Sequence, residues 1–120
     1  MQYFGLTLCL RDDPAALDAY RRYHQAVWPG VLQRLRDCGV QHMRIFLRGR
    51  RLFMYLETDD AFDPQRDFVR INDDPISAEW NRLMATLQER APEATEAEWW
   101  AVMEPVFDLA AQHSALRRDH

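Results

Sequence analysis

With 120 residues and a formal net charge of -4 at pH 7, the chain has the length of one domain, and its acidic balance argues against a nucleic-acid partner. No apolar stretch is long enough to cross a membrane, and the N-terminus lacks the basic region of a signal peptide, so we expect a cytoplasmic protein. The two cysteines, Cys9 and Cys38, stand in apolar contexts without metal-ligand spacing, which predicts buried free thiols and no zinc site.

The first part of the chain is predicted as a strand followed by a helix that a proline interrupts. Residues 3–10 are predicted as a strand, because Leu6, Leu8 and Leu10 would point to one face and Gly5, Thr7 and Cys9 to the other. Asp13 and Pro14 then mark a helix start, with Asp13 as N-cap and Pro14 in the first helical position. Pro29 lacks an N–H and its ring clashes with the carbonyl four residues back. It therefore ends this helix and begins a second helical piece, which stops at Gly39.

The second part is predicted as a hairpin, two helices and a last strand. Alternating side chains predict the two hairpin strands, over residues 42–48 and 52–58. Asp-Pro pairs mark the starts of the two helices, over residues 64–71 and 76–90. Residues 99–109 are predicted as the last strand, where Pro105 requires an edge position or a bulge because it cannot donate to a ladder. A polar tail covers residues 110–120.

The order strand, helix, strand, strand, helix, strand is typical of an α+β, ferredoxin-like fold in one domain, residues 1–109. Such a fold has a four-stranded antiparallel sheet with helices on one face only. The bare face would carry apolar side chains, and a second copy packed against it would cover them. The sequence therefore predicts a homodimer.

His24 is the best candidate for acid–base chemistry, because an imidazole with an unperturbed pKa near 6.5 exchanges protons at neutral pH. It stands four residues after Tyr20 and four before Trp28, so the three rings can share one helix face. The alternative is a partly buried structural histidine. His42, His113 and His120 lie in less suggestive places, a strand and the tail.

The aromatic residues around His24 have two interpretations. Tyr20 and Trp28 could form a platform for a sugar, since aromatic faces stack on the C–H patches of carbohydrates and tyrosine adds a hydroxyl. They could equally be core residues, as could Trp80. In the pair Trp99-Trp100 the side chains alternate, so one is expected in the core and the other at an interface.

Several motifs together resemble the L-rhamnose mutarotase family, which includes L-fucose mutarotases. The first is Tyr20-x-x-x-His24-x-x-x-Trp28-Pro29, after the first strand. The others are Leu56-Glu57 in the hairpin, Trp80-Asn-Arg-Leu-Met84 in a helix, and the ending Met103-Glu-Pro-Val-Phe107-Asp-Leu109. The resemblance covers residues 3–109, nearly the whole chain.

The resemblance implies a dimeric α/β-barrel type of ferredoxin-like fold and aldose 1-epimerase activity on a monosaccharide, without metal or cofactor. It implies that His24 is the proton donor and that Tyr20 and Trp80 contact the sugar. Met43 stands where the rhamnose-type pattern has a sugar-contacting tyrosine, and Asn81 where it has a second tryptophan. These two departures, at positions expected to face the substrate, favour L-fucose or another 6-deoxyhexose over L-rhamnose.

Two other functions stay open at this point, because one fold hosts many activities. One is a cofactor-free or haem-degrading monooxygenase on the same fold, which haem absorbance or oxygen uptake would reveal. The other is a non-catalytic dimer that binds a 6-deoxyhexose without speeding the exchange of its anomers.

Overall fold

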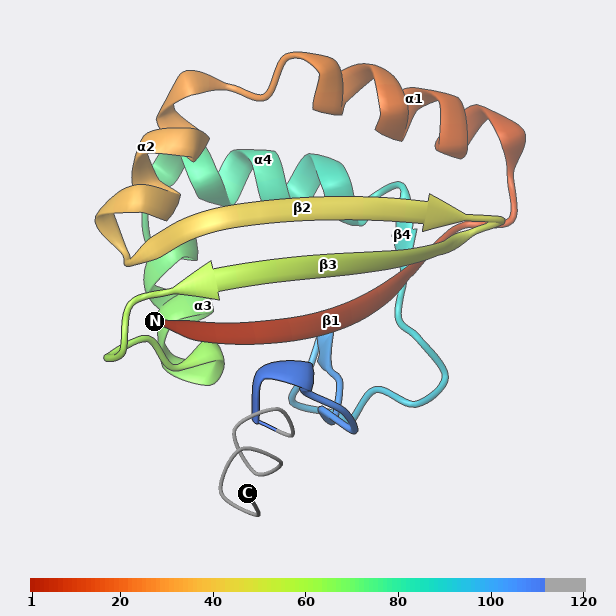
Figure 1. The fold of residues 1–120 in the computed structure, drawn as a ribbon. Helices are drawn as coiled ribbons and strands as arrows, with labels where there is room; N and C mark the ends of the chain where they lie inside the picture. Colours follow the sequence, from red (N-terminus) through yellow and green to blue (C-terminus); the bar gives the residue numbers. More distant parts are fainter. Residues whose placement is uncertain (112–120) are drawn as a thin grey trace.

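The computed structural model describes residues 1–111, which form an α+β fold with one antiparallel sheet (Figure 1). Strands β2, β3 and β1 lie side by side in that order, and two short strands, β4 and β5, both pair with the free edge of β1. The strands are β1 (Gln2–Leu10), β2 (Val40–Arg48), β3 (Arg51–Thr58), β4 (Gln88–Glu89) and β5 (Ala101–Val102). The predicted α+β class, the antiparallel sheet and the hairpin are confirmed.

Four helices lie on one side of the sheet, and each begins with a proline (Figure 1). They are α1 (Pro14–Gln25), α2 (Pro29–Asp37), α3 (Pro64–Asn72) and α4 (Pro75–Ala85). Before α1, α3 and α4 stands an aspartate whose carboxylate accepts a backbone N–H of the first turn, at 3.0–3.1 Å. These caps satisfy donors that the helix cannot pair internally, which explains why all three helices start at Asp-Pro pairs.

The break between α1 and α2 lies where the sequence predicts it. Trp28 has φ -57° and ψ 132°, an extended conformation that the following proline favours. The helix α2 ends before Gly39, whose φ of +99° suits only glycine, and a Cβ there would lie 2.5 Å from a carboxylate oxygen of Asp59. The predicted stop is therefore confirmed.

The core lies between the helices and the inner face of the sheet. Leu6, Leu8 and Leu10 of β1 are completely buried, as are Leu52 and Leu56 of β3. They belong to two adjoining apolar clusters. One surrounds Leu6 and contains Cys38, Val40, Met54, Leu56, Phe62 and Ile71; the other surrounds Leu8 and Leu10 and contains Tyr20, Val31, Leu52, Trp80 and Met84. The predicted free thiols Cys9 and Cys38 are both buried.

The free edge of β1 differs from the prediction, because two short strands share the place of one. The predicted helix over residues 76–90 is wrong beyond Ala85. The Arg11 N–H takes the carbonyl of Leu87, and Gln88 then pairs with Leu10 in β4. The predicted strand over residues 99–109 is wrong except for Ala101–Val102, after which the N–H of Met103 still donates to the carbonyl of Gly5 at 2.7 Å before the chain leaves the sheet. The predicted four-stranded sheet therefore has five strands.

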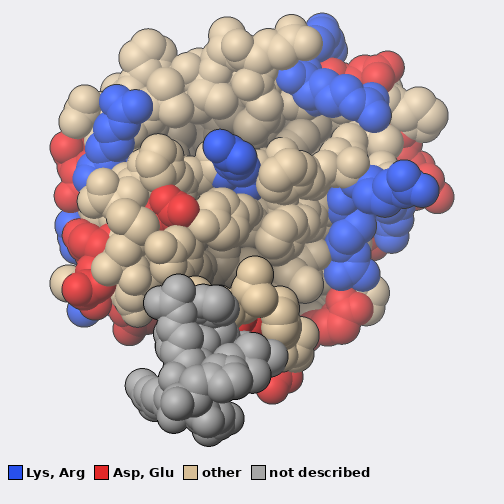
Figure 2. Space-filling model, in the orientation of Figure 1, with Lys and Arg blue, Asp and Glu red and all other residues tan. Residues whose placement is uncertain are grey.

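The outer face of the sheet carries exposed aromatic rings. Tyr3 stacks near Tyr55, and Phe46 near Phe53, with ring centroids 6.3 and 6.1 Å apart. Tyr3, Phe46 and Phe53 are 62%, 55% and 38% exposed. Figure 2 shows that the face over the strands is mostly uncharged, whereas most charged side chains gather toward its sides.

Candidate functional site

Helix α1, the connection from α1 to α2 and helix α4 bring together a group of rings, which we call the aromatic cluster: Tyr20, Tyr23, His24, Trp28 and Trp80. His24 stacks on Tyr20 with ring centroids 4.1 Å apart, as the four-residue spacing predicts. Trp80 makes T-shaped contacts with His24, Trp28 and Tyr23, with ring centroids 5.4, 5.2 and 6.3 Å apart. Trp80 is therefore the centre of the cluster.

The rings of the aromatic cluster differ in how far they are buried. Tyr20 and Trp80 are each only 5% exposed and belong to the second core cluster, whereas His24 and Trp28 are half-buried and Tyr23 is exposed. The imidazole thus stands at the border between the core and the solvent. A small molecule that reaches this border can meet His24 and Trp28 without the core opening.

The hydrogen bond of His24 indicates which ring nitrogen is free. Its Nδ1 lies 2.9 Å from the carbonyl oxygen of Tyr20. A carbonyl only accepts, so Nδ1 carries the hydrogen and Nε2 has a lone pair in the neutral ring. Burial lowers the pKa of His24 from its ordinary value, and the bond to the Tyr20 carbonyl opposes this in part. The neutral form, with Nε2 as proton acceptor, is therefore favoured.

Burial shifts the pKa of Tyr20 in the opposite direction to that of His24. Burial raises the pKa of its phenol to about 12, although a side-chain hydrogen bond with Gln88 works in the lowering direction. The phenol stays protonated at every pH at which His24 titrates. Tyr20 can therefore donate or accept a hydrogen bond, but it is not a base near neutral pH.

Met43 and Asn81 lie outside the aromatic cluster. Met43 is on the inner face of β2, opposite Leu56, and packs against the first core cluster rather than the one that holds Tyr20 and Trp80. Asn81 is exposed on α4, where its amide donates to the side-chain oxygen of Asn72 at 3.0 Å. The structure therefore joins four of the six predicted site residues, and contact of Met43 and Asn81 with a substrate stays a prediction.

Two neighbours of the cluster were not predicted from the sequence. Tyr23 precedes His24, but its contact with Trp80 depends on how α1 meets α4, which no local pattern encodes. Gln88 lies in β4, 6% exposed, and its predicted place in a helix concealed it. Trp100 packs against both core clusters while Trp99 is 42% exposed, which confirms that one of the pair is core.

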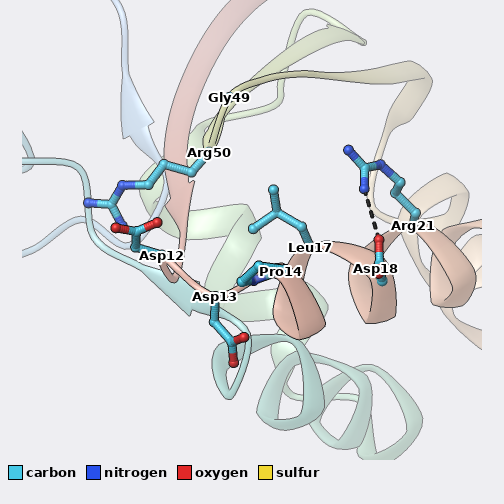
Figure 3. Close-up of a pocket in the computed structure, with 8 residues that line it drawn as sticks. All are labelled: Asp12, Asp13, Pro14, Leu17, Asp18, Arg21, Gly49 and Arg50. Atoms are coloured by element: carbon cyan, nitrogen blue, oxygen red, sulfur yellow. Dashed lines mark hydrogen bonds and ion pairs between the residues drawn. The ribbon is translucent and has the colours of Figure 1, made fainter.

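An open pocket lies elsewhere, at the start of α1. Figure 3 shows it between the β1–α1 connection and the β2–β3 turn, with the Asp18–Arg21 ion pair on one side and Arg50 beside Asp12 on the other. Its lining is largely charged and includes no member of the aromatic cluster. This pocket therefore adds nothing to the predicted site.

Other titratable groups are scattered. His42 lies on the outer face, 3.9 Å from a carboxylate oxygen of Glu57, while His113 and His120 lie outside the described residues. Within residues 1–111, no three His, Cys, Asp or Glu side chains are grouped so that they could hold a metal ion. In the same range, no helix has the length and apolar character needed to cross a membrane.

The fold and the cluster define a small α+β domain with a titratable ring among aromatic side chains, between helix and sheet. A profile described as L-rhamnose mutarotase matches residues 3–109. The chain is 37% identical over 110 residues to a UPF0734 protein of Dictyostelium discoideum, covering 88% of each chain. It is 32% identical over 112 residues to the L-fucose mutarotase of Xanthomonas campestris pv. campestris, covering 92% of this chain and 90% of that one.

A solved structure shows the same fold. It is an L-rhamnose mutarotase from Formosa agariphila, with a TM-score of 0.65 and 19% identity, covering 91% of this chain and 99% of the other. Because the profile spans nearly the whole chain, the protein belongs to the L-rhamnose mutarotase family. The predicted family is thus confirmed.

Proposed function

We propose that this protein is a sugar mutarotase that interconverts the α and β anomers of a 6-deoxy-L-hexose, with His24 as its acid–base group. Family membership supports mutarotase activity. The observation that carries the mechanism is the half-buried imidazole of His24 between Tyr20 and Trp80, with Nε2 free.

The reaction needs only proton transfers. Neutral His24 takes the proton of the anomeric hydroxyl at Nε2 while the bond from C1 to the ring oxygen breaks, and the imidazolium then passes this proton to the ring oxygen, with the Tyr20 hydroxyl or a water molecule as relay. The resulting aldehyde turns about one bond, and the reverse transfers close the ring on its other face. No covalent bond to the protein forms, and every proton that leaves one oxygen returns to another.

The aromatic rings supply the binding surface. Trp28 is half-buried, so part of its face is open to a sugar, whereas Trp80 is 5% exposed and serves as the wall behind His24. Stacking of an indole on sugar C–H groups needs no charge, which suits a neutral monosaccharide. Tyr20 adds a hydroxyl at the buried end.

We favour L-fucose over L-rhamnose as the sugar. Met43 and Asn81 depart from the rhamnose-type pattern, and a relative that is 32% identical is named an L-fucose mutarotase. A thioether and a small amide at these two positions remove a phenol and an indole from the expected lining, so the two sugars should bind differently.

We further propose that two copies pack through the outer faces of their sheets. Exposed Tyr3, Phe46 and Phe53 form stacked pairs with their neighbours on this face, which Figure 2 shows to be largely uncharged. Apolar side chains gathered on one face favour association. The two aromatic clusters would lie on the far sides of the sheets, each between its own helices and sheet.

The test is anomer exchange, measured by saturation-transfer NMR on several aldoses with the purified protein. Faster exchange for L-fucose than for L-rhamnose supports both parts of the proposal. Binding without faster exchange would show a sugar-binding protein instead, and haem absorbance or oxygen uptake would favour the monooxygenase alternative.

A further inference from the structure

We propose that residues 103–108, which we call the C-terminal arm, add as a strand to the free edge of β2 in a second copy of this chain, while the arm of that copy adds to β2 of the first. The inference rests on the proposed packing of two copies through their outer faces and deepens it, because it states which segments the copies exchange. It starts from an apolar segment that leaves its own sheet and from a long strand with an unpaired edge.

The arm is apolar and exposed. The N–H of Met103 donates to the carbonyl of Gly5, and in the described part of the chain no later backbone group of the arm bonds to the sheet. The side chains of Val106 and Phe107 are 88% and 62% exposed, and those of Val102 and Met103 are also exposed. A run of exposed apolar side chains on one segment is typical of a surface that contacts a partner.

Strand β2 has the complementary property, a free edge. It pairs with β3 on one side, and among the described residues no strand pairs with its other side (Figure 1). Its pairing with β3 is regular from His42 to Arg48, so the other side presents a row of unpaired backbone N–H and C=O groups. An open edge of this kind accepts an additional strand.

The charges of the two segments are complementary. Arg44 and Arg48 are outward, exposed residues of β2, and within the described chain neither forms an ion pair. The arm has two exposed carboxylates, Glu104 and Asp108. Opposite charges on neighbouring strands are favourable, and they determine partner and register more than strength. The arm therefore has the sign of charge that suits this edge.

The covalent structure of the arm also suits an edge. Pro105 has no N–H to donate, which excludes it from the middle of a sheet. In a strand added at the edge, the backbone of every second residue faces away from the ladder, so a proline is tolerated there. The arm would be the outermost strand of the partner's sheet, where this condition is met.

A two-fold dimer can bring the two segments together. β2 and β5 lie on opposite edges of the sheet (Figure 1). A two-fold axis between the outer faces and parallel to the strands therefore places the β2 edge of one copy over the β5 edge of the other. Packed sheets lie about 10 Å apart, and six extended residues span up to about 20 Å. The arm is long enough to cross from its own sheet to β2 of the partner.

The first test is an exchange of charge. Arg44→Glu with Arg48→Glu places acidic side chains opposite the acidic arm and should raise the Kd of the dimer about tenfold in sedimentation, the scale of two exposed ion pairs. Adding Glu104→Arg with Asp108→Arg to the same chain should restore the wild-type Kd, because the pairs then form with reversed signs. Failure of this rescue would contradict contact between the arm and β2.

The matched control and an apolar variant complete this test. Arg11→Glu with Arg36→Glu changes the net charge equally, at exposed positions away from β2, and should leave the Kd unchanged. Phe107→Asp should raise the Kd at least about tenfold, because it removes a ring that the contact buries. Since Phe107 is exposed in the single chain, this variant should fold, which circular dichroism checks.

The decisive measurement is disulfide formation between chains that each carry one new cysteine. Chains with a cysteine at Phe46, or at the outward residue on either side of it in β2, are mixed with chains that carry Val106→Cys or Phe107→Cys and are oxidised. The native Cys9 and Cys38 are buried, so wild-type chains should not link.

We expect linked heterodimers with one of the two arm cysteines and not with the other, since neighbouring residues of a strand point to opposite faces. Phe46→Cys alone should not link to itself, because the two β2 strands lie at opposite edges of the dimer. Equal links from both arm cysteines, no link from either, or self-linked Phe46→Cys would overturn the proposal.

The results separate this proposal from those on which it depends. A wild-type dimer that Phe53→Glu dissociates and Phe107→Asp does not would keep the packing of outer faces and refute the exchange of arms alone. A wild-type monomer at micromolar concentration would refute both. Anomer exchange in the same samples tests the mutarotase function separately, since the aromatic cluster contains no residue of the arm or of β2.

Discussion

Replacing His24 with alanine should cut anomer exchange at least about a hundredfold, the low end of the contribution of a positioned acid or base. The reason is that His24 is the one ring of the aromatic cluster that titrates near neutral pH, and its Nε2 is the free proton acceptor. Tyr20→Phe keeps the ring that stacks on His24 and loses only a hydroxyl, so its effect should be milder, about tenfold.

The same substitution should cost little stability. The ring centroid of His24 lies 4.1 Å from that of Tyr20 and 5.4 Å from that of Trp80. Each such ring pair contributes about 0.5–1.5 kcal/mol to the free energy of unfolding. Because the imidazole is half-buried, a loss of about 1 kcal/mol is expected, which lowers Tm by roughly 4–8 °C in a domain of this size. Circular dichroism should therefore show a folded variant at 25 °C.

The pH dependence has a defined sign. Burial lowers the pKa of His24 below its ordinary 6.5, so exchange should be constant above this pH and fall as the medium becomes more acidic. The unfolded chain takes up the proton at higher pH than the folded one, so this group also costs stability as pH falls below 6.5. Both effects should vanish in His24→Ala.

The measurements are exchange by saturation-transfer NMR from pH 5 to 8 and thermal melting of the same samples. Wild-type exchange in His24→Ala, whatever its melting temperature, would show that His24 is not the acid–base group. A hundredfold loss in a variant that no longer melts cooperatively would also contradict the reasoning, since it would place the ring in the core.

Three other results are expected. Asp67→Asn should lower stability by about 1–2 kcal/mol in chemical denaturation, because its buried carboxylate accepts from Arg66, Arg70 and the N–H of Asp63. These bonds lower the pKa of Asp67 to about 2. The carboxylate therefore stabilises the fold above pH ~4, and this stabilisation is lost as the pH falls toward 2. An Asp67→Asn variant whose stability depends on acid as the wild type does would contradict this. Phe53→Glu should convert a dimer into a monomer in sedimentation, while Val69→Glu, at an exposed position of α3, should not; a wild-type monomer at micromolar concentration would refute the interface. Anomer exchange should survive EDTA, because the proposed steps use only His24 and Tyr20; complete loss that a divalent metal restores would overturn that mechanism.

The sequence predicts those parts of the fold that depend on near neighbours. Asp13-Pro14 and the later Asp-Pro pairs start helices because cap and first residue act within one turn. Gly39 ends α2 because its positive φ is a local requirement. The stacking of His24 on Tyr20 follows from helix geometry alone, so the placement of two of the five rings of the aromatic cluster is predictable before any tertiary contact is known.

The rest depends on pairing between distant segments. Nothing between Thr86 and Arg90 marks a helix end, yet α4 stops at Ala85 because Gln88 pairs with Leu10, far away in sequence. The alternating residues after Trp99 suggest a long strand, but β4 takes the edge of β1 at Cys9 and Leu10, and the pairing of β5 ends close to Pro105, which has no N–H to donate to a ladder. The meeting of Trp80 with the rings of α1 has the same origin, so its place could be taken only from a family resemblance.

Pro29 links the local and the distant parts of the site. It forces Trp28 into an extended conformation, so the ring of Trp28 leaves the stripe of α1 and meets Trp80 instead, 5.2 Å away. His24, in the last turn of α1, meets the same indole at 5.4 Å and has only an open chain beyond it. A continuous helix would continue past His24 and cover it with its next turn. The break therefore leaves the imidazole half-buried. Its partial burial favours the neutral form, and its exposed part can contact a substrate.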